Sequence, residues 1–122
     1  MTDHSLTGER EREMTGGVCL VTGASYGLGA EISRQLGRAG WTVILVARSP
    51  DKLEAVQREI SAGDGGGSAL ALPCDITDTE AVLQLEKKVR ENFPEGPDIV
   101  INNAVLCFYI LVLVKYYFTR II

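Results

Sequence analysis

The sequence predicts an α/β protein with a doubly wound parallel sheet. Short apolar runs alternate with segments of helical period, and the first apolar run ends in a cluster of glycines. Strands and helices that alternate in this way form parallel sheets through right-handed crossovers. The 122 residues leave room for one small domain. We therefore expect a sheet of about four strands, in the order 3-2-1-4.

The composition argues against several classes of function. A net charge of −4 and the lack of a basic face argue against nucleic acid as a partner. His4 is the only histidine and has no neighbouring ligands, so we expect no metal site. Cys19, Cys74 and Cys107 form no Cys-x-x-Cys pair, which favours buried thiols in a reducing compartment and a cytoplasmic protein.

Three segments of the chain differ in character. Residues 1–16 are polar, with alternating Glu and Arg at positions 9–13, and have no apolar core typical of a secretory signal. We expect them to form a flexible tail. Residues 17–104 carry the alternating strands and helices, and residues 105–122 form an apolar tail.

The first strand and the turn after it are the most informative stretch. Residues 18–21 predict a buried strand that leads into Gly23, Gly27 and Gly29. A helix follows, with an apolar face expected at Leu28, Ile32, Leu36 and Ala39. Strand, glycine turn and helix present free backbone N–H groups and the positive end of a helix dipole to an anion. We expect a phosphate group there, although such turns also occur for steric reasons alone.

The second strand and helix follow directly. Gly40 ends the first helix, and residues 41–46 form a strand rich in β-branched side chains. Ser49 caps the next helix, with Pro50 at its first position. Its apolar face is expected at Leu53, Val56 and Ile60. The glycine-rich residues 63–67 predict a flexible loop that is open to proteolysis.

A third and a fourth strand are separated by one more helix. Residues 69–72 predict the third strand, and Thr77 and Glu80 have the spacing of a capping box. The apolar face of this helix is expected at Val82, Leu85, Val89 and Phe93. Prolines and a glycine at 94–97 end it, and residues 98–101 predict the fourth strand.

The glycine spacing narrows the choice of ligand. The turn reads Thr-Gly-x-x-x-Gly-x-Gly from Thr22 to Gly29, which is neither Gly-x-Gly-x-x-Gly nor a Walker A loop. It resembles the turn of the short-chain dehydrogenases/reductases. That resemblance covers residues 17–104 and implies a Rossmann-like fold, in which the middle and last glycines let a cofactor pyrophosphate approach the backbone.

The other strand ends agree with this resemblance. In the family, an acidic residue after the third strand contacts adenine, and an Asn-Asn-Ala-Gly segment lies against the adenosine end. Carboxyl ends of parallel strands meet at one edge of a sheet. The resemblance implies these cofactor-binding residues: Thr22, Gly23, Ser25, Tyr26, Gly27, Leu28, Gly29, Arg48, Asp75, Ile76, Asn103 and Ala104.

Arg48 bears on which dinucleotide is bound. An NAD site needs a carboxylate at the end of the second strand to accept hydrogen bonds from the ribose 2′-OH. Ala47 occupies that position, and its neighbour Arg48 offers a guanidinium suited to a 2′-phosphate. We expect NADP rather than NAD; the alternative is that Arg48 is simply a solvated surface residue.

The resemblance to a catalytic protein ends after Ala104. Family members transfer hydride to or from a carbonyl or alcohol substrate with a Ser, a Tyr and a Lys in Tyr-x-x-x-Lys spacing. Tyr109 and Lys115 are six apart, and Val105 stands where the family has Gly. We expect an NADP-dependent oxidoreductase by family, in a truncated form that binds the cofactor without catalysis. The alternative is a non-catalytic dinucleotide-binding or regulatory fragment.

The apolar tail has three interpretations. A spanning helix needs about 20 apolar residues, whereas Lys115 interrupts the apolar run that begins at residue 104. A fifth strand or a segment that covers the sheet edge is favoured on length. A membrane anchor through residues 104–122 is the second interpretation, and translation of an unspliced intron is the third. Substrate and oligomeric state stay open.

Overall fold

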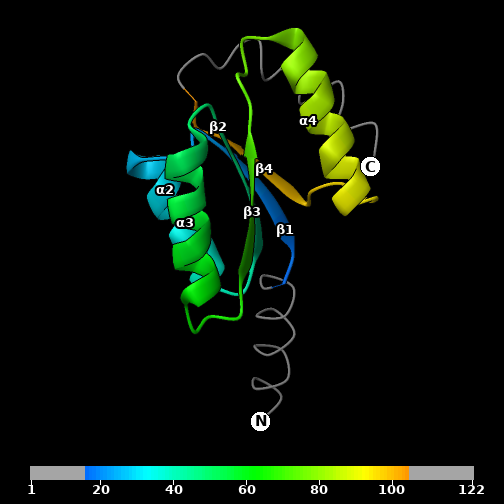
Figure 1. Ribbon diagram of the computed structural model, residues 1–122. Coiled ribbons are helices and arrows are strands. Elements are labelled where there is room, and N and C mark those ends of the chain that lie inside the picture. Colours follow the sequence, from blue (N-terminus) through cyan, green and yellow to red (C-terminus); the bar gives the residue numbers. More distant parts are fainter. Residues whose placement is uncertain (1–15, 105–122) are drawn as a thin grey trace.

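The computed structural model describes residues 16–104, which form one sheet with helices on both faces (Figure 1). Strands and helices alternate along the chain, as expected. The elements are β1 (Val18–Thr22), α2 (Gly27–Arg38), β2 (Thr42–Ala47), α3 (Pro50–Ala62), β3 (Ser68–Pro73), α4 (Thr79–Asn92) and β4 (Ile99–Asn102).

The sheet has the predicted topology. Its strands are all parallel and lie in the order β3-β2-β1-β4. Thr22 lies opposite both Val46 and Asn102, and Val46 lies opposite Leu72. The carboxyl ends of the four strands are therefore level, and the residues that follow them emerge at one edge of the sheet.

Side chains alternate between two cores on opposite faces of the sheet, as the period of a strand requires. One core lies between the sheet and helices α2 and α3, and the other lies under α4 (Figure 1). In β1 and β2, the first core contains Cys19, Val21, Val43 and Leu45, and the second contains Leu20, Ile44 and Val46. Because both faces are covered, these strands read as continuous apolar runs.

The buried face of α2 matches the predicted face only in part, at Leu36, which packs partly buried against the first core. Its buried positions are Gly29, Ala30, Ser33 and Gly37, whereas Leu28 and Ala39 are exposed. Small residues at four-residue spacing let this helix approach closely: a Cβ atom on Gly37 would lie 2.6 Å from Ile60 Cγ2 of α3. The prediction was wrong at Leu28 and Ala39 because hydrophobic periodicity weights large side chains, and the contact with α3 is made by small ones.

The helix ends partly match the predicted caps. Gly40 has φ +91°, and Trp41 N donates to Leu36 O at 3.0 Å, so α2 ends as expected in a glycine-terminated Schellman motif. The capping box predicted for α4 is wrong. Asp78 is the N-cap, and its carboxylate accepts from Glu80 N and Ala81 N. Thr77 instead donates from its backbone N and its Oγ1 to Asp75 Oδ1, two residues earlier.

The glycine-rich loop after α3 packs tightly against α2. A Cβ atom on Gly65 would lie 2.4 Å from Arg38 O, and one on Gly67 would lie 2.2 Å from Gly37 O. These two glycines are thus needed for close backbone approach, which the expectation of a flexible loop did not include.

The outer edge of β3 is covered by a side chain from α3. Ala71 N donates to Gln57 Oε1 at 2.9 Å, which satisfies a backbone donor that faces away from β2. Covered edges protect a sheet from pairing with other chains.

The expectations for residues 1–15 and 105–122, including Cys107 and the apolar tail, lie outside the described residues. No helix within residues 16–104 combines the length and apolar character that crossing a bilayer requires.

Candidate functional site

A cleft of about 530 Å³ lies at the carboxyl edge of the sheet. This volume is within the range of small-molecule sites, about 300–1,000 Å³. Residues from the ends of all four strands and from the first turn of α3 line it: Gly23, Ser25, Tyr26, Leu28, Val46, Ala47, Arg48, Ser49, Lys52, Cys74, Asp75, Ile76, Thr77, Asn103 and Ala104.

The turn between β1 and α2 forms one wall of the cleft. Gly23 and Gly27 have φ of +65° and +57°, a left-handed conformation that side chains disfavour. Ala24 N donates to Val46 O at 3.2 Å, which ties the turn to β2. The first backbone N–H groups of a helix have no acceptor within the helix. The start of α2 at Gly27 therefore offers donors to an anion.

Gly29 is fixed by close packing. A Cβ atom there would lie 2.1 Å from Gly23 O and 2.7 Å from Asn103 Nδ2. The space next to its α-carbon is filled by the backbone of the turn, so Gly29 brings the first turn of α2 against the end of β1.

Hydrogen bonds join the glycine turn to the end of β4. Thr22 Oγ1 donates to Asn102 Oδ1 at 3.0 Å and accepts from Ala104 N at 3.2 Å. Asn103 Nδ2 donates to Gly23 O at 3.4 Å. Thr22 is almost completely buried, at 2% exposure, so its hydroxyl positions the two strand ends from beneath the cleft.

The opposite wall carries Arg48 and Asp75. Asp75 Oδ1 accepts from Thr77 N at 3.0 Å and from Thr77 Oγ1 at 2.7 Å. These hydrogen bonds lower the pKa of Asp75, and the charge of Arg48 lowers it further. Asp75 is therefore an ionised acceptor in a fixed orientation near neutral pH.

Cys74 lines the same wall but is not suited to nucleophilic chemistry. Burial raises the pKa of its thiol to about 11, and the carboxylates of Asp75 and Asp78 add to that shift. A thiol is nucleophilic only as the thiolate. Cys74 thus contributes a small apolar surface to the cleft, as part of the core under α4.

The structure brings most of the sequence-predicted site residues together. Nine of the twelve line the cleft: Gly23, Ser25, Tyr26, Leu28, Arg48, Asp75, Ile76, Asn103 and Ala104. Thr22, Gly27 and Gly29 do not line it. Thr22 and Gly29 lie behind its wall, and Gly27 carries the left-handed turn.

Sequence reasoning missed Ser49 and Lys52, which also line the cleft. Ser49 was expected only as a helix cap, yet its side chain makes no capping hydrogen bond. Lys52 stands one helical turn after Arg48, and a second cation at that spacing was the available signal.

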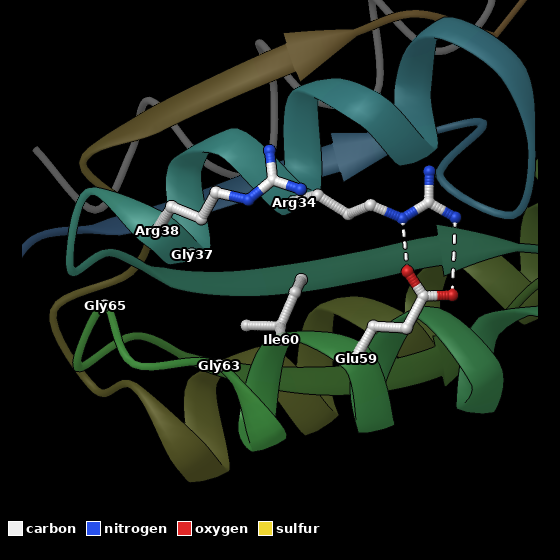
Figure 2. Close-up of a pocket in the computed structure, with 7 residues that line it drawn as sticks. All are labelled: Arg34, Gly37, Arg38, Glu59, Ile60, Gly63 and Gly65. Carbon is white, nitrogen blue, oxygen red and sulfur yellow. Dashed lines mark hydrogen bonds and ion pairs between the residues drawn. The ribbon is translucent and has the colours of Figure 1, made fainter.

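A second, smaller cavity lies between α2, α3 and the loop after α3 (Figure 2). Its volume is about 70 Å³, and its charged groups are already paired. Arg34 forms hydrogen bonds with both carboxylate oxygens of Glu59, as the dashed lines in Figure 2 show, and Arg38 pairs with Glu31. This cavity is part of the contact between helices and does not resemble a ligand site.

Comparison with known protein families decides what the cleft belongs to. The model of the short chain dehydrogenase family matches residues 17–112, which is most of the chain. The chain belongs to the short-chain dehydrogenase family. The match includes every residue that lines the cleft and extends past Ala104.

Relatives of this short-chain dehydrogenase sequence are oxidoreductases. A fatty acyl-CoA reductase of Mycobacterium tuberculosis is 46% identical over 92 residues, which cover 75% of this chain and 30% of the relative. Human dehydrogenase/reductase SDR family member 1 is 38% identical over 91 residues, which cover 75% of this chain and 28% of the relative. The chain thus spans less than a third of the length of these relatives.

Solved structures agree with the fold. L-sorbose reductase from Gluconobacter frateurii, complexed with NADPH and L-sorbose, has a TM-score of 0.69 and 33% identity, over 75% of this chain and 34% of that one. A metagenomic short-chain oxidoreductase in complex with NADP has a TM-score of 0.67 and 42% identity, over 74% of this chain and 39% of that one. Among the residues of our structure, no group of His, Cys, Asp and Glu is arranged to hold a metal ion.

Proposed function

We propose that the cleft binds NADP(H), as the cofactor site of a short-chain oxidoreductase. The pyrophosphate lies against the glycine turn, the 2′-phosphate lies at Arg48, and the adenine lies near Asp75 and Ile76. One observation carries this proposal: the glycine turn, Arg48, Asp75 and Asn103 all line one cleft, although they come from four separate strand ends.

The chemistry of each wall supports this orientation. Free amides at the start of α2 suit a pyrophosphate. One oxygen of Asp75 is held by Thr77, while Oδ2 makes no hydrogen bond within residues 16–104 and can accept one from the adenine amino group. Neither Ala47 nor Arg48 supplies the carboxylate that a ribose 2′-OH requires, which favours NADP over NAD.

Glycines 23, 27 and 29, together with Thr22, form the frame of this site. Gly23 and Gly27 supply left-handed backbone, and Gly29 allows close packing. Thr22 and Asn103 fasten the turn to β4. In this proposal, these residues set the position of the amides that contact the cofactor.

The reaction we propose for the oxidoreductase is hydride transfer between NADPH and a carbonyl or alcohol substrate. Relatives that include fatty acyl-CoA reductases and solved complexes that contain NADP(H) support this class. The cleft described here accounts for cofactor binding; it contains no Tyr and Lys in Tyr-x-x-x-Lys spacing.

A second candidate is a non-catalytic dinucleotide-binding or regulatory fragment. The observation that favours it is that the residues lining the cleft account for cofactor binding and include no Tyr-x-x-x-Lys pair. The two candidates share the cleft and differ in whether the protein has a catalytic form. In a reductase assay with NADPH and simple aldehydes or ketones, oxidation of NADPH would refute the second candidate, whereas the first predicts turnover only where a Ser, Tyr and Lys set is present.

Fluorescence titration with NADPH and with NADH tests the cofactor proposal. We expect the wild-type chain to bind NADPH more tightly than NADH. Arg48→Ala removes a charge-assisted contact, so NADPH affinity falls about ten-fold or more while NADH affinity changes little. Arg58→Ala, at an exposed position of α3 outside the cleft, is the matched control. An affinity of Arg48→Ala for NADPH equal to that of wild type would refute the proposed role of Arg48.

A further inference from the structure

A lysine and a tyrosine face each other across the mouth of the cleft. Lys52 lies in the first turn of α3, and its Nζ is 5.7 Å from the centroid of the Tyr26 ring. Tyr26 precedes α2 in the glycine turn and is 71% exposed. Both residues line the cleft, so this cation–π contact connects its two walls.

The basic side chains at this wall form no salt bridge within residues 16–104, although the charge of Arg48 acts on Asp75. Within residues 16–104, Arg34, Arg38 and Arg90 each form a salt bridge with a glutamate, whereas Arg48 and Lys52 form none. Within the same residues Arg58, Lys87 and Lys88 form no salt bridge either, so what sets Arg48 and Lys52 apart is that they line the cleft, where no ion pair has to break before an anion binds.

Arg48 and Lys52 lie at the start of α3, where positive charges are unfavourable without an anion. Arg48 lies just before the N-cap Ser49, and Lys52 lies in the first turn, where Asp51 is the acidic residue. Cations near a helix N-terminus oppose the helix dipole. A bound anion would compensate both positive charges and the dipole at once.

We propose that Lys52 is the second cation of the 2′-phosphate subsite, and that Tyr26 is a positioning residue that holds Lys52 at the cleft. This inference rests on the proposed NADP(H) site. A phosphate monoester carries about −1.5 to −2 charges at pH 7, so the guanidinium of Arg48 alone leaves part of that charge uncompensated. Lys52, one turn further along the same wall, supplies the remaining positive charge.

Ser49 supports the same subsite. It lies between Arg48 and the first turn of α3, and its hydroxyl makes no capping hydrogen bond. Because Ser49 also lines the cleft, that hydroxyl is available as a donor to a phosphate oxygen. Guanidinium, hydroxyl and ammonium groups then surround one position at the adenosine end of the cleft.

Titration of the full 122-residue chain with NADPH, NADH, 2′,5′-ADP and 5′-AMP tests the role of Lys52. In Lys52→Gln we expect affinity for NADPH and 2′,5′-ADP to fall about ten-fold, with a shallower dependence of affinity on salt, while NADH and 5′-AMP are unaffected. Lys87→Gln, at an exposed position of α4 outside the cleft, is the control and should bind like wild type.

Two variants of Tyr26 test the positioning role. Tyr26→Phe keeps an aromatic face for Lys52, so NADPH affinity stays close to wild type. Tyr26→Leu removes it, and we expect a two- to five-fold loss that is absent in the Lys52→Gln background, because the two residues act through one contact.

The outcomes distinguish this inference from the proposal beneath it. If wild type binds neither NADPH nor 2′,5′-ADP, the NADP(H) site itself is refuted. If wild type binds both and Lys52→Gln binds them equally well, Lys52 is not part of the subsite and the NADP(H) site stands. An equal loss for NADPH and NADH would also overturn the inference, since Lys52 would then contact a group that both cofactors share.

Discussion

Gly29 and Gly23 are in backbone contact: a Cβ atom on Gly29 would lie 2.1 Å from the carbonyl oxygen of Gly23. This contact seats the first turn of α2 against the end of β1. The amides of the glycine turn, and therefore the proposed pyrophosphate site, depend on it.

Gly29→Ala should both destabilise the fold and weaken cofactor binding. The methyl group has no room, because the obstructing atoms belong to the backbone, and overpacking of this kind costs about 1–3 kcal/mol. Urea denaturation followed by circular dichroism measures the loss. Gly63→Ala is the matched control, since its Cβ atom would lie an acceptable 3.4 Å from Ile60 O and its φ is −77°. Equal stability of the two variants would show that the contact can relax.

Thr22→Val should loosen the end of β4. The change keeps the shape of the side chain but removes the donor to Asn102 Oδ1 and the acceptor for Ala104 N. Losing these two partly buried hydrogen bonds costs about 1–3 kcal/mol, and NADPH affinity should fall with it. Thr42→Val removes a hydroxyl contact with Ser68 that is exposed, so we expect almost no change there. Denaturant midpoints and an NADPH titration of Thr22→Val and Thr42→Val make this comparison, and equal results for the two variants would contradict the role of Thr22.

Gln57→Ala should uncover the outer edge of β3. The hydrogen bond from Ala71 N to Gln57 Oε1 is lost, at a cost of about 1 kcal/mol, and a strand edge becomes available to other chains. Light scattering during incubation at elevated temperature should show faster aggregation than in wild type. Gln84→Ala, which removes an exposed contact with Glu80, serves as the control. Identical scattering from both variants would argue that other features protect this edge.

Stability should decline at alkaline pH because of Cys19. Burial raises the pKa of its thiol from 9.0 to about 11. The folded chain therefore holds this proton more tightly than the unfolded chain. The contribution of the protonated thiol to the free energy of unfolding is complete below pH 9 and is lost as the pH rises through 11. Lysines and tyrosines titrate in the same range. The test is thus the urea midpoint of wild type and of Cys19→Ala, each measured as a function of pH. The two midpoints should converge toward pH 11, and a constant difference between them would contradict the raised pKa of Cys19.

The order of the strands and the meeting of their ends could be predicted from the sequence. Strand positions follow from apolar runs such as residues 42–47, and the breaks between them from glycine and proline. Parallel topology then places the residues after each strand at one edge, which is why Arg48, Asp75 and Asn103 were expected together.

Contacts made by small residues could not be predicted from the same pattern. The buried face of α2 consists of Gly29, Ala30, Ser33 and Gly37, and hydrophobic periodicity gives such positions little weight. The tight packing of Gly65 and Gly67 on the end of α2 was likewise invisible, because a glycine that serves close approach looks the same in sequence as one that serves flexibility.

The cap of α4 and the role of Lys52 illustrate a third limit. Thr77 and Asp78 are both good N-cap residues, and the choice of Asp78 depends on Thr77 being held by Asp75. Lys52 was not singled out from the sequence, and its contact with Tyr26 comes from the fold. Residue preferences along the chain do not distinguish such alternatives, and contacts between distant residues decide between them.

Mapping NADP⁺ onto the chain by ¹H–¹⁵N NMR is the most direct test of the proposed site. During titration, we expect the largest amide shift changes in the turn from Gly23 to Gly29 and at Arg48, Asp75 and Asn103, with little change around the Arg34–Glu59 pair. The absence of saturable shifts, or shifts confined to the cavity between α2 and α3, would contradict the assignment of the cleft as a dinucleotide site.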